Sequence, residues 1–269
     1  MEVQDSRAMG AVQGSDPATR PAGMRERFFP EVAAGGFTRV DGTIEFYTRI
    51  NALLRPEMTL VDFGAGRGAA LHDDTCAYRR NLRNFRGKVA KVVGLDVDPV
   101  VMHNPGLDEA HVIPESGVLP LSDASADIIV SDFTFEHVPD AEKCAAELGR
   151  ILKPGGWLCA RTPNRWGYVA LLTQLIPDRM HGSVLRRVQP DRKEQDVFPT
   201  CYRMNTMKTV RKLFPATGFR DASYTFSPEP AYLPQRAALW RAVLAGERLL
   251  PPLLHTNLFI FLQKRLPHP

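Results

Sequence analysis

A run of glycines directly after a short apolar segment is the first stretch of this chain that could do chemistry. Residues 59–61 lead into Asp62, and glycine then stands at every second position, as Gly64, Gly66 and Gly68. Glycine allows backbone angles that other residues avoid and lets a ligand approach the main chain closely. Residues 69–72 could open a helix whose unpaired N–H groups face that ligand. Taken alone, the stretch predicts either a nucleotide cradle or an ordinary tight turn.

Acidic side chains end three later apolar runs of the sequence. Asp96 closes residues 89–96, Glu115 closes residues 111–115, and Asp132 closes residues 127–132. Ligands of parallel sheets bind at the carboxyl ends of the strands, so we expect these acids to share one rim with the glycines and with residues 162–164. Such an acid can bind a ligand, or it can simply cap the end of its own strand.

Strands and helices that alternate along the chain would position these residues. Beyond the runs above, residues 157–162, 219–226 and 258–262 read as strands. Helical patterns are expected at residues 44–54, directly after Asp98-Pro99, and at 141–152, 207–214 and part of 230–254. Residues 153–156, Lys-Pro-Gly-Gly, are expected to end the helix that precedes them. This alternation predicts an α/β fold with a doubly wound, mostly parallel sheet.

Composition favours one globular domain with an extension at its beginning. The chain has 269 residues, and 44% of them are hydrophobic. Residues 1–24 lack periodicity and are rich in small and polar residues, so we predict a disordered tail followed by a single domain over 25–269. Two segments, 166–205 and 230–254, read as insertions. The net charge of +4 is too small to argue for nucleic acid as a partner.

The cysteines and the apolar runs bear on the compartment. The four cysteines stand far apart with no metal-ligand spacing, which predicts reduced thiols and no metal site. No apolar run reaches the 18 residues expected of a spanning helix. We therefore expect a cytoplasmic protein.

Five sequence motifs, taken in order, resemble those of one enzyme family. They are Val61-Asp62-Phe63-Gly64-Ala65-Gly66-Arg67-Gly68, Val93-Gly94-Leu95-Asp96-Val97-Asp98, Val118-Leu119-Pro120-Leu121, Ala126-Asp127-Ile128-Ile129-Val130-Ser131-Asp132 and Glu147-Leu148-Gly149-Arg150-Ile151-Leu152-Lys153-Pro154-Gly155-Gly156. In this order they are similar to class I S-adenosylmethionine-dependent methyltransferases of the small-molecule, type 11-like branch. The resemblance covers about residues 44–165. It implies a Rossmann-like sheet of seven strands, mostly parallel with the last strand antiparallel, and helices on both faces.

A dehydrogenase is the main competing interpretation, since Gly64-x-Gly66-x-x-Ala69 also fits a dinucleotide-binding turn. In that fold the acid that binds the ribose follows the glycines by about 20 residues. Here Asp96 follows them by roughly 30 residues, and the Leu-Pro and Lys-Pro-Gly-Gly elements have no place in the dehydrogenase pattern. The spacing favours the methyltransferase.

The resemblance implies roles for the residues of the expected rim. The glycine loop, including Ala65 and Gly68, would hold S-adenosylmethionine, and Asp62 would support the turn or bind the ammonium group. Asp96 would accept from both ribose hydroxyls, because one carboxylate offers two oxygens. Glu115 would accept from the adenine amino group, with a backbone contact from Ser116. The remaining residues expected to contact the cofactor are Val97 and Asp132.

The expected reaction is an in-line displacement that moves the methyl group to a small-molecule, glycan or lipid-linked acceptor, most simply at oxygen. A hydroxyl acceptor benefits from a base, for which His137 is the first candidate and Asp132 the second. Residues 166–205 and 230–254 would form the acceptor pocket and lid. The leucines and arginines of residues 230–254 also suggest peripheral contact with the inner face of a membrane, although packing on the sheet is the favoured explanation. An RNA methyltransferase and a non-catalytic cofactor-binding protein remain as alternatives.

Overall fold

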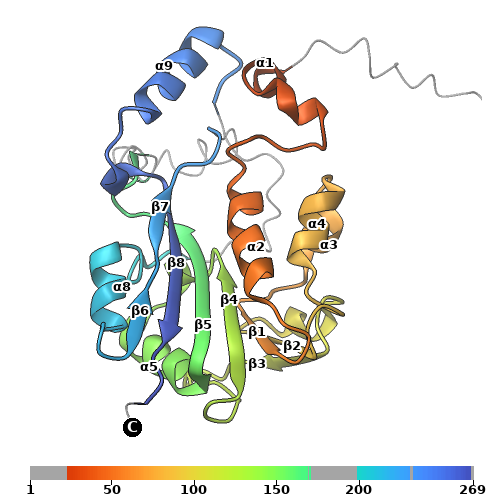
Figure 1. Ribbon diagram of the computed structural model, residues 1–269, viewed down its shortest axis with the longest axis vertical. Helices are drawn as coiled ribbons and strands as arrows, with labels where there is room; N and C mark the ends of the chain where they lie inside the picture. The colour runs from red at the N-terminus through yellow and green to blue at the C-terminus, as the bar shows by residue number, and fades with distance from the viewer. Residues whose placement is uncertain (1–22, 169, 171–198, 231–232, 268–269) are drawn as a thin grey trace, which may run out of the picture.

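The computed structural model describes residues 23–168, 170, 199–230 and 233–267, which form one mixed sheet covered by helices (Figure 1). The sheet order is β3-β2-β1-β4-β5-β8-β6, and β7 also pairs with β8. Strands β3, β2, β1, β4 and β5 are parallel, whereas β8 runs antiparallel to β5, β6 and β7. The strands are β1 (Thr59–Phe63), β2 (Lys91–Asp96), β3 (Glu109–Val112), β4 (Ala126–Asp132), β5 (Leu152–Pro163), β6 (Phe219–Asp221), β7 (Tyr224–Phe226) and β8 (Asn257–Lys264).

Helices cover both faces of this sheet. The α-helices are α1 (Met24–Phe28), α2 (Gly42–Leu53), α3 (Ala69–Asp73), α4 (Ala77–Arg83), α5 (Ala141–Ile151), α8 (Met207–Leu213) and α9 (Ala237–Glu247). The short 3₁₀ helices are η2 (Pro30–Ala33), η3 (Pro99–His103), η4 (Phe135–His137) and η6 (Pro252–Leu254). Acidic N-caps begin two of the long helices: Asp41 accepts from Thr43 and Ile44 in α2, and Asp140 accepts from Lys143 in α5.

Strand alternation divides the apolar residues into two cores. On β4, Ile129 belongs to the core that α5 and α8 cover, whereas Ile128 and Val130 belong to the core that α2 and α4 cover. The other parallel strands follow the same rule, since side chains of successive residues point to opposite faces. At the carboxyl ends of the strands, alternate residues of each strand therefore lie on opposite faces of the sheet.

The predicted doubly wound α/β sheet and its antiparallel end are confirmed, with three differences in detail. The third strand lies at Glu109–Val112 rather than 111–115, because residues 114–117 form a turn that Gly117 N–H closes on the Pro114 carbonyl. Strand β5 begins at Leu152 rather than Trp157, so the Lys-Pro-Gly-Gly segment lies inside a strand with an irregular register instead of ending a helix.

The strand expected at 219–226 is the third difference, because the chain divides it into β6 and β7. Between them the Ser223 hydroxyl oxygen accepts a hydrogen bond from the Phe261 N–H, a position that a backbone carbonyl takes in an unbroken ladder. The sheet consequently has eight strands rather than the expected seven.

The two predicted insertions differ in how much of them the structure describes. Most of residues 166–205, like most of the predicted tail 1–24, lies outside the described residues. Within 230–254, α9 lies beside α1 at the end of the sheet toward which the parallel strands run (Figure 1), and Trp240 stacks on Phe28 with ring centroids 5.7 Å apart. No helix among the described residues is long and apolar enough to cross a bilayer.

Candidate functional site

The glycine loop leaves β1 in a left-handed backbone conformation. Gly64, Gly66 and Gly68 have φ angles of 82°, 51° and 73°, which side chains other than glycine rarely adopt. A Cβ atom on Gly64 would overlap Thr134, and one on Gly68 would overlap Asn104. A Cβ on Gly66 would meet no atom within 4 Å. The loop is thus closely packed at both ends and open at its centre.

Hydrogen bonds fix this loop to the end of β2. The Asp96 carboxylate accepts from the Gly66 N–H at 2.8 Å and from the Asp98 N–H at 2.9 Å. The Asn104 amide donates to the carbonyls of Ala65 and Gly66 at 3.0 and 3.1 Å. Asp96 is therefore brought to the open centre of the loop, and Asn104 supports the loop through its carbonyls.

Four charged residues form a row across neighbouring strands on the α2/α4 face of the sheet. We call Asp96, Asp62, Asp132 and Arg161 the charged row. Register places them together: Asp62 pairs with Gly94 and Val130, so that Asp96 and Asp132 each lie two residues further along, and Asp132 pairs with Arg161. The structure thus brings Asp96 and Asp132 to one edge of the sheet, as expected, and adds Asp62 to them.

Asp132 is the most heavily bonded member of the charged row. Arg161 donates to both of its carboxylate oxygens at 2.7 Å, and Tyr47 and Arg83 donate to Oδ2 at 3.0 and 2.9 Å. Burial alone would raise the pKa of Asp132, but the charges and hydrogen bonds of Arg161, then Arg83 and Tyr47, lower that pKa to about 2. A carboxylate held in this way is a weak proton acceptor near neutral pH.

Asp62, unlike Asp132, lacks such partners among the described residues. Its side chain makes no hydrogen bond or ion pair with any residue that the structure describes, and its strand neighbours in the row are Asp96 and Asp132. Burial, followed by the negative charges of Asp132 and Asp96, raises the pKa of Asp62 to about 7, although the positive charge of Arg83 opposes this. An unpaired carboxyl among like charges is suited to receive a cation.

The other predicted cofactor contacts lie at the margin of the rim. Val97 follows Asp96 and is exposed. Glu115 and Ser116 are exposed in the turn after β3, and the start of that turn is tied to the row because the Ile113 N–H donates to the Asp96 carbonyl. No hydrogen bond or ion pair among the described residues joins the Glu115 side chain to the loop, so its role stays a prediction.

His137 lies in η4, which packs in the core on the opposite face of the sheet. Its Nδ1 is 2.9 Å from the Pro199 carbonyl oxygen. A carbonyl oxygen only accepts hydrogen bonds, so Nδ1 carries the proton, and the lone pair of the neutral imidazole is on Nε2. This is a tautomer that can accept a proton.

Buried polar residues around η4 make up a second group, which we call the neutral network: Ser131, Glu136, Thr162 and Asn205. The Thr162 hydroxyl donates to Glu136 at 2.9 Å and accepts from the Asn205 amide at 2.6 Å. The Glu136 carbonyl accepts from the N–H groups of Cys201 and Tyr202. These bonds attach residues 199–205 to the helix that carries His137.

Sequence reasoning missed Arg161, Arg83, Phe133 and Asn104. Arg161 was visible as a charged residue inside an otherwise apolar strand, which demands a buried partner. Phe133 has a φ of 55° and lies 4.6 Å from the Arg161 guanidinium, measured to its ring centroid. Such backbone strain outside glycine occurs most often at functional sites. Arg83 was visible only as one of several basic residues in residues 78–88, a run without acids, and Asn104 gave no comparable signal.

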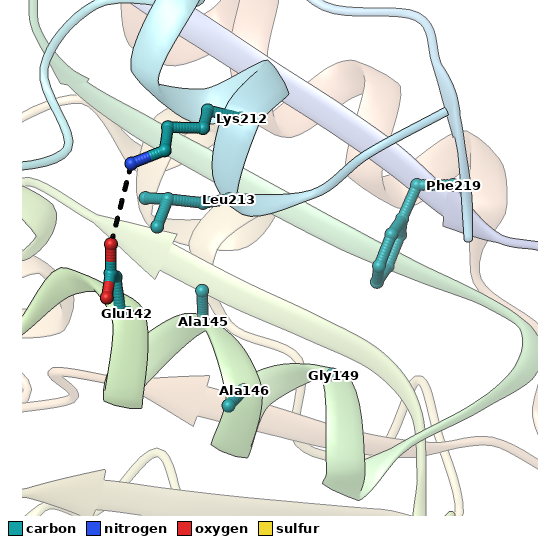
Figure 2. Close-up of a pocket in the computed structure, with 7 residues that line it drawn as sticks. All are labelled: Glu142, Ala145, Ala146, Gly149, Lys212, Leu213 and Phe219. Atoms are coloured by element: carbon teal, nitrogen blue, oxygen red, sulfur yellow. Dashed lines mark ion pairs between the residues drawn. The ribbon is translucent and has the colours of Figure 1, made fainter. Parts of the chain in front are cut away.

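Two surface cavities formed by described residues lie away from this rim. One cavity of about 350 Å³ lies between α5 and α8, where Figure 2 shows an ion pair between Glu142 and Lys212 above a floor that includes Ala145 and Gly149. Both charged side chains of that pair are largely exposed. A second cavity, of about 380 Å³, is lined by Met58 and Asp127 at the opposite, amino ends of the strands. In open α/β sheets ligands bind at the carboxyl ends, so neither cavity is our candidate site.

Comparison with known proteins adds an independent observation. Residues 38–224 match the family model described as a methyltransferase domain. The chain is 36% identical over 80 residues to a probable S-adenosylmethionine-dependent methyltransferase of Mycolicibacterium smegmatis, covering 28% of this chain and 30% of that protein. It is 29% identical over 130 residues to the dimethylglycine N-methyltransferase of Parasynechococcus marenigrum, covering 45% of this chain and 44% of that protein.

A third relative is the malonyl-[acyl-carrier protein] O-methyltransferase 1 of Coxiella burnetii, 30% identical over 114 residues. That match covers 42% of this chain and 36% of the relative. The chain thus spans less than half the length of each of these curated relatives.

Proposed function

The chain belongs to the class I S-adenosylmethionine-dependent methyltransferases, and we propose that it methylates a small-molecule, glycan or lipid-linked acceptor at oxygen. The observation that carries this proposal is the glycine loop, which follows Asp62 on β1, is open at Gly66 and is bonded to the buried Asp96. When bound, the cofactor supplies an activated methyl group on a sulfonium centre. The protein has to bind, orient and keep water out.

The residues present fit this cofactor. The open position at Gly66 leaves room for a ligand beside the main chain. Asp96 presents a buried carboxylate, whose oxygens have lone pairs beyond those used by Gly66 and Asp98, for a ribose diol. Asp62 offers an unpaired carboxyl for the ammonium group. We further propose that Val97 and the Glu115-Ser116 turn border the adenine.

His137 is our candidate for the base that receives the proton of a hydroxyl acceptor. The Pro199 carbonyl holds the imidazole in the tautomer with its lone pair on Nε2, as this role requires. The competing assignment, Asp132, is disfavoured by its low pKa and by its bonds to Arg161, Arg83 and Tyr47. If His137→Gln turned over at the wild-type rate at every pH, His137 would be a structural residue.

The acceptor atom is the least constrained part of the proposal. One relative bears the name of an N-methyltransferase and another that of an O-methyltransferase, so membership of the family favours neither. We prefer oxygen because a histidine base next to the rim suits a hydroxyl, whereas a neutral amine needs less help. RNA is a weaker candidate because the net charge of +4 supplies little attraction for phosphates.

Peripheral membrane contact is a separate proposal for the segment 230–254. Leu249 and Leu253 are 86% and 65% exposed, next to the exposed Arg248. Trp240, in contrast, is buried against Phe28 and is not available to a membrane. Co-sedimentation with anionic vesicles should fall in a Leu249→Ser/Leu253→Ser variant, and equal binding by this variant and the wild type would refute the contact.

Calorimetric titration with S-adenosylmethionine tests the cofactor assignment. Asp96→Ala should weaken binding by about tenfold or more, the size of a lost charge-assisted hydrogen bond. Asp123→Ala is the matched control, because Asp123 is a 78% exposed carboxylate that pairs with Arg150. Transfer of labelled methyl groups to lipid-linked glycan, small-metabolite and RNA fractions would then identify the acceptor. Absence of cofactor binding by the folded wild type would overturn the proposal.

A further inference from the structure

Arg83 is a partly exposed cation beside the charged row, and it has no role in the function proposed for Asp62, Asp96 and His137. It comes from the end of α4, where its Nη2 donates to Asp132 at 2.9 Å and its guanidinium lies 5.3 Å from the centre of the Tyr47 ring. The Arg83 side chain is 23% exposed, whereas that of Arg161 is 5% exposed. Of the two arginines that hold Asp132, Arg83 is the one that a ligand can reach.

Asp132 does not need Arg83 for charge balance. Arg161 already binds both oxygens of Asp132 in a two-point pair, and its remaining Nη1 donates to Thr43 at 3.1 Å. Arg83 adds a second positive charge to a carboxylate that is already neutralised. A guanidinium has five N–H donors, and Arg83 forms no ion pair besides Asp132 within the described part of the chain.

Two other arginines of the basic segment, residues 78–88, differ from Arg83 in this respect. Arg79 pairs with Asp41 and Asp74, and Arg86 pairs with Asp108. Each has a carboxylate that no other arginine shares among the described residues. Of these arginines only Arg83 directs its charge to the row, where it lies beside the Asp62 carboxyl that has no partner among the described residues.

We infer that Arg83 binds a ligand carboxylate at the candidate site. This inference rests on the proposed function, because that function supplies two ligands that could carry the group. One is the amino-acid end of the cofactor, whose ammonium and carboxylate would match Asp62 and Arg83 together. The other is an acidic acceptor. The planar fork of arginine matches the two oxygens of a carboxylate.

Calorimetry on an Arg83→Met variant separates the two sources. Arg86→Met is the matched control, since it removes the same charge from the same segment at a side chain that is 55% exposed and away from the row. Each protein is titrated with S-adenosylmethionine and with its decarboxylated analogue. Each is then saturated with S-adenosylhomocysteine and titrated with malonate as the carboxylate probe. Arg83→Lys, which keeps the charge but not the fork, covers the case in which Arg83→Met does not fold.

If the carboxylate belongs to the cofactor, Arg83→Met weakens S-adenosylmethionine binding about tenfold and leaves the analogue's affinity within about twofold of wild type. If it belongs to the acceptor, both cofactor affinities stay unchanged, and malonate binding is lost in Arg83→Met but not in Arg86→Met. Arg83→Lys should show the same loss in weaker form.

The inference is overturned if folded Arg83 variants bind all these ligands as the wild type does. It is overturned equally if the analogue loses as much affinity as S-adenosylmethionine and malonate binding is unaffected, because Arg83 would then support the site without contacting a carboxylate. Failure of the proposed function has a different signature, in which the wild type binds neither S-adenosylmethionine nor its analogue.

Discussion

On two central strands, adjacent residues place a charged side chain on one face of the sheet and a neutral polar side chain on the other. On β4, Asp132 joins the charged row and its neighbour Ser131 joins the neutral network. On β5, Arg161 and Thr162 divide in the same way. The charged row therefore faces α2 and α4, and the neutral network faces α5 and η4, although one residue separates them in sequence.

The two groups satisfy their polar atoms differently. In the charged row every member except Asp62 has strong partners, and the site is open at Gly66. The neutral network is closed: Ser131 and Asn205 are almost completely buried, and neither the Ser131 hydroxyl nor the Asn205 carbonyl oxygen has a hydrogen-bond partner among the residues that the structure describes. Charge held next to an opening is suited to ligands, whereas a closed neutral group is suited to holding η4 and residues 199–205 in place.

Removing Arg161 should have the largest effect of the changes considered for these two groups. Arg161→Met leaves the Asp132 carboxylate buried without its two-point partner, which we expect to cost about 3 to 5 kcal/mol of unfolding free energy. Thr162→Val, one residue away, leaves neutral groups without partners and should cost about 1 to 3 kcal/mol. Urea denaturation of both variants measures the difference.

A double variant provides the control for Arg161. Asp132→Asn removes the negative charge that Arg161 neutralises, so Arg161→Met should cost less in the Asp132→Asn background than in the wild type. Equal costs in both backgrounds, or a larger loss in Thr162→Val than in Arg161→Met, would mean that the two faces do not differ in the way described.

The sequence was sufficient to predict the alternating α/β fold because the parallel strands are short apolar runs separated by helical patterns. It also predicted that Asp96 and Asp132 share an edge with the glycine loop, since parallel strands bring their carboxyl ends together. It did not predict that β5 starts at Leu152, because a Lys-Pro-Gly-Gly segment usually ends a helix and here forms an irregular strand.

The electrostatic state of each acid could not be predicted from the sequence. Asp62 and Asp132 look equivalent as acids at or near strand ends, yet their pKa values are about 7 and about 2. The difference comes from Arg161 and Arg83, which lie 29 and 49 residues from Asp132 in the chain. Long-range pairing of this kind leaves no local pattern in one sequence.

Asp62 gives the next prediction, a pH dependence of cofactor affinity. The ammonium group requires the ionised carboxylate, whereas burial, Asp132 and Asp96 hold the pKa of Asp62 near 7 against the opposing charge of Arg83. Affinity for S-adenosylmethionine should be constant above that pKa and fall by up to about tenfold per pH unit below it. Calorimetry at pH 6, 7 and 8 measures this slope.

Asp62→Asn is the matched variant, because it keeps the shape and removes the titrating group. It should bind the cofactor more weakly at pH 8 and lose the change in affinity between pH 8 and pH 6. A slope that persists in Asp62→Asn would assign the titration to another group. Stability should move in the opposite direction to affinity, since a raised carboxyl pKa stabilises the fold at lower pH and that contribution is lost as the pH rises through about 7.

Glu136, in the neutral network, should give the smallest effect. Burial raises its pKa, opposed by hydrogen bonds from its own backbone and from Thr162 and by the charge of His137, and reinforced by the charge of Asp132. Its contribution to stability is therefore complete below the pKa of the unfolded chain and declines as the pH rises through the folded value. Glu136→Gln keeps the polar contact with Thr162 and removes the titration, so its unfolding free energy should change by no more than about 1 kcal/mol, the size of one neutral hydrogen bond.

The difference in unfolding free energy between wild type and Glu136→Gln, measured in urea at pH 5 and pH 8, isolates Glu136 because Asp62 titrates in both proteins. Because burial raises the pKa of Glu136, the variant should gain stability relative to the wild type as the pH rises from 5 to 8. A loss in the variant at pH 8 larger than that of Thr162→Val would show that the network depends on a charged Glu136. In that case both faces of the rim would hold buried charge, and a ligand site could not be assigned to one face from charge alone.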